Sequence, residues 1–149
     1  MNTLSALYDS DFYAWAEQNA QLMKSGRFDE LDTEHLIEEI ESMGSSEKRA
    51  LESRLIELML HLLKWQFQAR RQGSSWEISI NKQRLAIERI LRNNPSLNYQ
   101  LYERVIDCYS YARRAAAIET KLPLATFPEN CPYTLEQLAD FEFMPCEIL

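Results

Sequence analysis

Apolar residues recur at intervals of three or four positions along most of the chain, and no stretch alternates apolar and polar residues as a half-buried strand does. This spacing predicts α-helices, because residues three and four apart share one helical face. The expected helices are about 10–25, 32–43, 46–70, 74–92 and 95–119. We therefore predict one all-α domain over residues 1–149, a bundle of about five helices with an extended, proline-containing C-terminal arm from about residue 121.

Glycine, proline and capping residues set the expected helix boundaries. Gly26 is placed to end the first helix, and Asp32 is a candidate N-cap for the second. Residues 44–46, Gly-Ser-Ser, leave two alternatives open: a break before the third helix, or one helix that runs through. The other expected boundaries are a capping box Ser74-x-x-Glu77 for the fourth helix, Asn94 followed by Pro95 for the fifth, and a capping box Thr134-x-x-Gln137 for a short helix in the arm.

The third expected helix is apolar on two sides. One stripe consists of Leu51, Leu55, Leu58, Leu62 and Trp65, and the other of Ile56, Leu60, Leu63 and Phe67. Such a helix lies at the centre of a bundle or beneath a partner subunit. The second helix has a single apolar face, formed by Leu36, Ile37, Ile40 and Met43.

Charge is segregated along the chain, whose net charge is −7. Residues 1–45 hold 10 acids against 2 bases, and residues 46–92 hold 10 bases against 5 acids. The acidic total argues against broad nucleic-acid binding, so we expect ion pairing within the chain or between subunits. The alternative is a nucleic-acid site in the basic 46–92 segment, with its basic run Arg70, Arg71, Lys82, Arg84, Arg89 and Arg92.

One candidate catalytic group lies on the polar line of the third helix. Glu57, His61 and Lys64 are spaced by about one helical turn. His61 beside a carboxylate could act as a general base, and Lys64 could stabilise an anion. The same spacing equally suits a structural polar seam between helices.

A candidate metal site depends on the second and third helices forming a hairpin at Gly44. Glu38 and Glu41 could then approach His61. A metal on these three side chains could activate water to hydrolyse a phosphate ester. The competing interpretation is a glutamate–lysine/arginine seam without metal, and we expect no cofactor.

Several features bear on location and on the class of function. The sequence has no run of ~18 apolar residues that would span a membrane, and its start lacks the pattern of a secretory signal. Three cysteines without a paired or metal-binding spacing favour a reducing cytoplasm. Because no complete catalytic set is present, we expect a cytoplasmic protein-interaction or self-association module, and specifically a homodimer.

Several segments in order carry a resemblance to a known family: "YDSDFYAWAEQNAQLMKSGRFDELDTEHLIEEIESMG", "LIELMLHLLKWQFQ", "SSWEISINKQR", "NPSL", "AAAIET" and "FPENCPYTLEQLAD". From about Tyr8 to Pro145 the chain closely resembles the bacterial, mainly cyanobacterial family called domain of unknown function number twenty-nine. The resemblance implies an all-α, cytoplasmic bacterial protein, and it assigns no catalytic residue.

Overall fold

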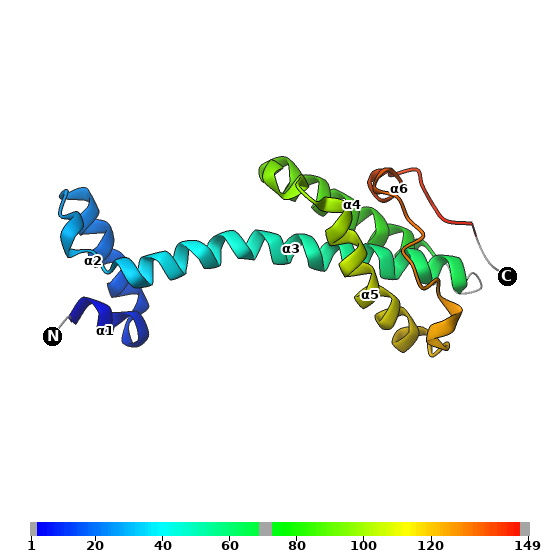
Figure 1. Ribbon diagram of the computed structural model, residues 1–149, viewed down its shortest axis with the longest axis horizontal. Helices are drawn as coiled ribbons and strands as arrows, with labels where there is room; N and C mark the ends of the chain where they lie inside the picture. The colour runs from blue at the N-terminus through cyan, green and yellow to red at the C-terminus, as the bar shows by residue number, and fades with distance from the viewer. Residues whose placement is uncertain (1–2, 69–72, 147–149) are drawn as a thin grey trace. The chain divides into compact units, whose positions relative to one another are not determined.

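The regular structure of this protein is helical throughout the part of the chain that the computed structural model describes, residues 3–68 and 73–146 (Figure 1). The all-α prediction is therefore confirmed. The contacts divide the chain into two compact units, Met1–Ser46 and Glu47–Leu149, each described by itself below. No helix within the described residues is long and apolar enough to cross a membrane.

The first unit begins with two short helices, α1 (Thr3–Ser10) and α2 (Phe12–Lys24). Asp11 caps α2 by accepting a hydrogen bond from the backbone N–H of Ala14 at 3.1 Å. Gly26, in the left-handed region at φ +72°, follows the end of α2 as the sequence predicts. A 3-10 turn, η1 (Phe28–Glu30), leads to the next helix. The sequence pattern predicted α2 but not α1.

The longest helix, α3 (Thr33–Phe67), contains residues of both units. It runs through Gly44 without a break, so the run-through alternative is correct and the predicted hairpin is absent. A glycine inside a helix costs only about 1 kcal/mol relative to alanine. That cost is too small by itself to end a helix of 35 residues.

The second unit packs α4 (Ser74–Asn93) and α5 (Leu101–Thr120) against the C-terminal part of α3. Its core includes Leu51, Leu58, Leu62, Leu63, Ile80, Val105 and Ala112, all with no exposed surface. Both apolar stripes of α3 contribute to this core, since Leu60 of the second stripe is buried too. The chain itself therefore covers most of both stripes, and Ile56, Trp65 and Phe67 are partly buried against the same core.

In the second unit, the predicted start of α4 at Ser74 is confirmed without its capping box, the predicted start of the fifth helix at Pro95 is wrong, and the predicted capping box in the arm is confirmed. The residue preceding α4 is Gly73 and no side chain caps the helix, so Ser74 does not start a capping box. Pro95 opens a separate 3-10 turn, η3 (Pro95–Asn98), and α5 begins only at Leu101. The capping box of Thr134 and Gln137 is present at α6 (Leu135–Ala139), with backbone-to-side-chain hydrogen bonds of 3.0 and 3.1 Å.

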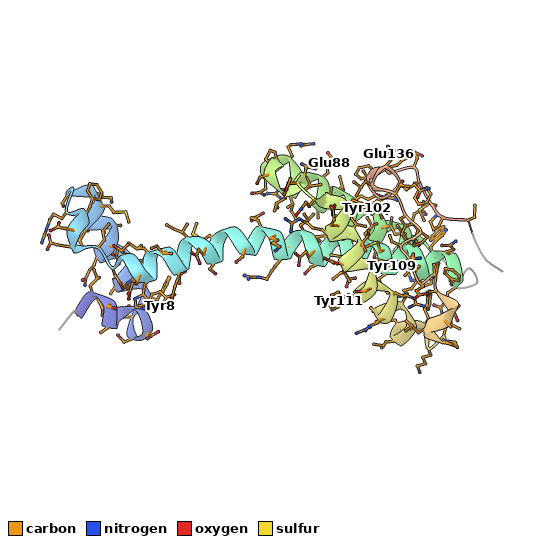
Figure 2. The ribbon with its side chains drawn as sticks, viewed as in Figure 1. Tyr8, Glu88, Tyr102, Tyr109, Tyr111 and Glu136 are labelled. Carbon is orange, nitrogen blue, oxygen red and sulfur yellow. The ribbon has the colours of Figure 1, made fainter. Side chains whose placement is uncertain are left out.

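The C-terminal arm has one 3-10 turn, η4 (Leu124–Thr126), and α6, separated by irregular chain. Hydrogen bonds tie it to α5. Tyr109, labelled on α5 in Figure 2, donates its hydroxyl hydrogen to the backbone oxygen of Pro128 at 2.6 Å. Arg113 Nε donates to the backbone oxygen of Phe127 at 3.2 Å, and the Phe127 side chain is buried.

Candidate functional site

The predicted catalytic residues lie along α3, but Lys64 is occupied by structural contacts. Its Nζ donates to Glu119 Oε2 of α5 at 3.1 Å and lies 5.0 Å from the centroid of the Trp76 ring of α4. His61 Nδ1 lies 2.8 Å from the backbone oxygen of Glu57. These contacts fit the structural-seam interpretation, and a catalytic role for Glu57, His61 and Lys64 stays a prediction.

The predicted metal ligands Glu38, Glu41 and His61 all belong to the uninterrupted helix α3. The hairpin that would place the two glutamates near His61 is absent. Within residues 3–68 and 73–146, no group of three or more histidine, cysteine, aspartate or glutamate side chains is arranged to hold a metal ion. The structure therefore does not contain the hairpin geometry that the hydrolase hypothesis requires.

The basic run expected to contact nucleic acid does not form one exposed surface. Arg84 is only 2% exposed, and it donates from Nε to the backbone oxygen of Leu138 at 2.9 Å and from Nη2 to that of Gln137 at 3.1 Å. Arg84 thus holds α6 against α4 and is not part of an exposed basic surface. Arg70 and Arg71 lie outside the described residues.

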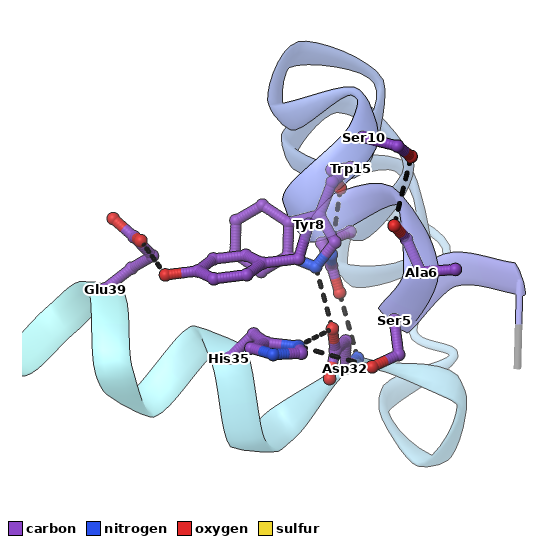
Figure 3. Close-up of polar contacts among 9 residues, drawn as sticks. Ser5, Ala6, Tyr8, Ser10, Trp15, Asp32, His35 and Glu39 are labelled. Atoms are coloured by element: carbon purple, nitrogen blue, oxygen red, sulfur yellow. Dashed lines mark hydrogen bonds and ion pairs between the residues drawn. The ribbon is translucent and has the colours of Figure 1, made fainter.

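A polar cluster that the sequence reasoning missed lies in the first unit (Figure 3). The buried carboxylate of Asp32 accepts a hydrogen bond from Trp15 Nε1 at 2.8 Å, and its Oδ2 lies 2.7 Å from His35 Nδ1. Asn19, also buried, accepts the backbone N–H of Asp32 through Oδ1 at 3.0 Å. The sequence signal for this cluster is an aspartate at the start of α3 followed by a histidine three residues later. From the sequence alone, that aspartate indicates only a helix cap.

Ser5, His35 and Asp32 resemble a catalytic triad in composition but not in geometry. Ser5 Oγ lies 3.3 Å from His35 Nδ1, the same nitrogen that meets Asp32. In a hydrolase triad the serine and the aspartate meet opposite ring nitrogens, so that one nitrogen is free to accept the serine proton. An Nδ1–H that donates to Asp32 cannot accept that proton, so this arrangement does not activate Ser5.

Tyr8 completes the cluster. Its ring stacks on the His35 ring with centroids 4.0 Å apart, and its hydroxyl donates to Glu39. That hydrogen bond, with some burial, raises the pKa of Tyr8 to about 12. The hydrogen bond to Asp32 raises the pKa of His35 above its usual 6.5 despite partial burial. The cluster joins α1 and α2 to the first turns of α3 and shows no activated nucleophile.

The largest departure from the predicted packing is the apolar face of the first part of α3. Ile37, Ile40 and Met43, predicted to lie on one apolar face with Leu36, are 49%, 65% and 69% exposed. The cluster contacts α3 through His35 and Glu39, so α1 and α2 cover the polar side of the helix here. An exposed apolar face on a long helix is typical of an interaction surface.

Comparisons with known proteins identify a family and nothing more specific. The family model described as "Domain of unknown function DUF29" matches residues 7–144. No curated protein and no solved structure matches the chain. The chain belongs to the DUF29 family, as its sequence resemblance implied.

Proposed function

We propose that this DUF29 protein is a self-association module, in which two copies pair through the exposed face Ile37, Ile40 and Met43 of α3. The observation that carries the proposal is that these three side chains remain at least 49% exposed on a helix whose later leucines are buried. Burying them against a second helix would remove apolar surface from water at roughly 25 cal/mol per Å².

The charge pattern of α3 supports a second copy in antiparallel orientation as the occupant. Before Gly44, α3 carries Glu34, Glu38, Glu39 and Glu41 and no lysine or arginine. Between residues 47 and 54 it carries Lys48, Arg49 and Arg54 against Glu47 and Glu52. Antiparallel pairing centred on Gly44 would set the acidic part of each helix beside the basic part of the other.

Gly44 itself supports close approach at this position. A Cβ atom added there meets nothing within 4 Å, so nothing within the described chain requires a glycine. A glycine that costs helix stability and has no role inside the chain suits a crossing point, where the backbones of two helices approach closely.

A cytoplasmic location is part of the proposal. Cys108, Cys131 and Cys146 are free thiols in the structure. Unpaired thiols are typical of proteins in a reducing compartment.

Sedimentation equilibrium of the full chain tests the proposal. The expected mass is twice 17.5 kDa at high concentration, with dissociation on dilution. Ile40→Gln should weaken association at least tenfold, a change of about 1.4 kcal/mol. The matched control is Ile118→Gln, because Ile118 of α5 is 77% exposed and lies outside the face.

Two results would contradict the proposal. One is a strict 17.5 kDa monomer at every concentration. The other is equal weakening by Ile40→Gln and Ile118→Gln, which would place the interface elsewhere.

A further inference from the structure

The second unit contains an apolar pocket of about 340 Å³ between α3, α4, α5 and α6. Its aliphatic lining includes Leu55, Ile87, Leu91, Leu101, Val105 and Leu138. Four polar residues, Arg84, Glu88, Arg92 and Asn98, also line it, and Figure 2 labels Glu88 on α4. Pockets that are mostly apolar, with a few polar groups, are typical binding sites for small molecules.

Arg84, one of the residues that line this pocket, has a hydrogen-bond donor without a partner. Its Nε and Nη2 donate to backbone oxygens of α6, but its buried Nη1 has no hydrogen-bond partner among the described residues. A buried donor left without a partner is costly. An acceptor oxygen delivered from the pocket would remove that cost.

The charge of Arg84 is also incompletely compensated. None of the ion pairs formed within the described residues involves Arg84. The glutamate one turn further along α4, Glu88, pairs instead with Arg92 at 2.6 Å. Burial lowers the pKa of Arg84, and only the charge of Asp140 opposes this effect. A buried cation without a paired anion favours a ligand that brings a negative charge.

We propose that this pocket binds a small aliphatic carboxylic acid, whose carboxylate accepts a hydrogen bond from Arg84 Nη1 and whose hydrocarbon chain lies among the aliphatic side chains of α3, α4 and α5. The site lies wholly within the second unit, whereas Ile37, Ile40 and Met43, on which the proposed function rests, belong to the first unit. The two proposals can therefore fail independently.

Calorimetric titration of the full chain with octanoate, below its micellar concentration, tests the site. Octanol serves as the uncharged analogue of the same chain length. We expect saturable binding of one octanoate per chain, and at least tenfold weaker binding of octanol. Absence of saturable octanoate binding would overturn the proposal, and equal affinity for the two compounds would overturn the role of Arg84.

A pocket-filling variant avoids removing Arg84, whose loss would also release α6. Ile87→Trp should reduce octanoate affinity at least tenfold, because the larger side chain occupies the pocket that Ile87 lines. Leu85→Trp is the control, since Leu85 lies two residues away on α4 and is 59% exposed. Unchanged octanoate binding by Ile87→Trp, with its helical circular dichroism retained, would place the ligand elsewhere and overturn the proposal.

Nuclear magnetic resonance tests the contact between the ligand carboxylate and Arg84 directly. The Nε proton donates to the buried Leu138 carbonyl, so its exchange with water should be slow enough for observation. We expect octanoate, but not octanol, to shift this resonance. If octanoate binds and leaves the Arg84 resonance unmoved, the proposed head-group contact is wrong.

Discussion

The two halves of α3 continue one helical pattern in different surroundings. In the second half, Leu51, Leu58 and Leu62 have no exposed surface. In the first half, Ile37 and Ile40 fall at the same helical period, yet roughly half or more of each side chain faces solvent. Periodicity thus identifies which residues share a face, and the neighbouring elements decide whether that face is covered.

The elements that pack against α3 cover different faces of its two halves because different interactions attach them to the helix. In the second unit α4 and α5 present Ile80, Val105 and Ala112 to α3, and apolar burial selects the face. In the first unit, the hydrogen bond from Trp15 to Asp32 and the stacking of Tyr8 on His35 bring α1 and α2 to the polar side. In the first unit, hydrogen-bonding geometry therefore determines which face of α3 is covered, and the apolar residues of that part of the helix stay exposed to solvent.

Truncating one apolar side chain in each half of α3 should give the largest difference in the free energy of unfolding. Leu62→Ala should lower the free energy of unfolding by roughly 2–5 kcal/mol, because it leaves a cavity in a fully buried site. Ile40→Ala should change it by less than about 0.5 kcal/mol in dilute solution, where association does not contribute. Urea denaturation followed by circular dichroism measures both. Equal losses would refute the difference between the two halves.

Removing a hydrogen bond within the polar cluster of the first unit should have a smaller effect on the free energy of unfolding. Trp15→Phe keeps most of the ring but removes the hydrogen bond to buried Asp32, which should cost about 1–3 kcal/mol. Tyr13→Phe is the control, because its hydroxyl contacts Glu17 at the surface. Equal urea midpoints for the two variants would show that the Trp15–Asp32 contact does not hold the unit together.

Gly44 provides a weaker test at the junction of the two halves. Gly44→Ala should raise the stability of the dilute chain by about 0.5–1 kcal/mol, since alanine is the better helix former and its Cβ meets no neighbour. The same substitution should weaken association, because it adds bulk at the proposed crossing point. A variant that is more stable and also more strongly associated would contradict the crossing at Gly44.

The pH dependence should be the smallest effect, because His35 is partly exposed to solvent. Its pKa in the folded chain is above the usual 6.5, so its contribution to stability is complete below that value and is lost as the pH rises through the raised pKa. Asp32, whose pKa is lowered, stays ionised throughout this range. His35→Gln should therefore destabilise the chain more at about pH 5.5 than at about pH 9. Thermal unfolding at both values measures the difference, and a larger loss at the higher pH would contradict the assignment.

Much of the fold could be predicted from local patterns. Helical spacing located α2, α3, α4 and α5 approximately, and the capping box at Thr134 located α6, because these signals depend on residues close in sequence. The short helix α1 gave no such signal, since its attachment depends on contacts of Tyr8 with residues about thirty positions away.

The candidate sites were less predictable because they depend on distant partners. In the sequence, Arg84 is one of several bases in a positively charged segment. Its structural role depends on hydrogen bonds to carbonyl groups 53 and 54 residues later in the chain. His35 is one of two histidines and belongs to no sequence motif, and its contacts with Tyr8 and Asp32 arise only in the folded chain. The hairpin on which the metal hypothesis depended is absent because α3 continues through Gly44.

An isotope-filtered nuclear Overhauser experiment tests the self-association of α3 most directly. Copies with ¹³C-labelled methionine methyl groups are mixed with unlabelled copies, so that only contacts between chains give signals. Met43 is exposed in the first half of α3, and Met59 is fully buried in the second half. The account predicts signals between chains from Met43 and none from Met59. Absence of a Met43 signal in a sample that sediments as a dimer would contradict it.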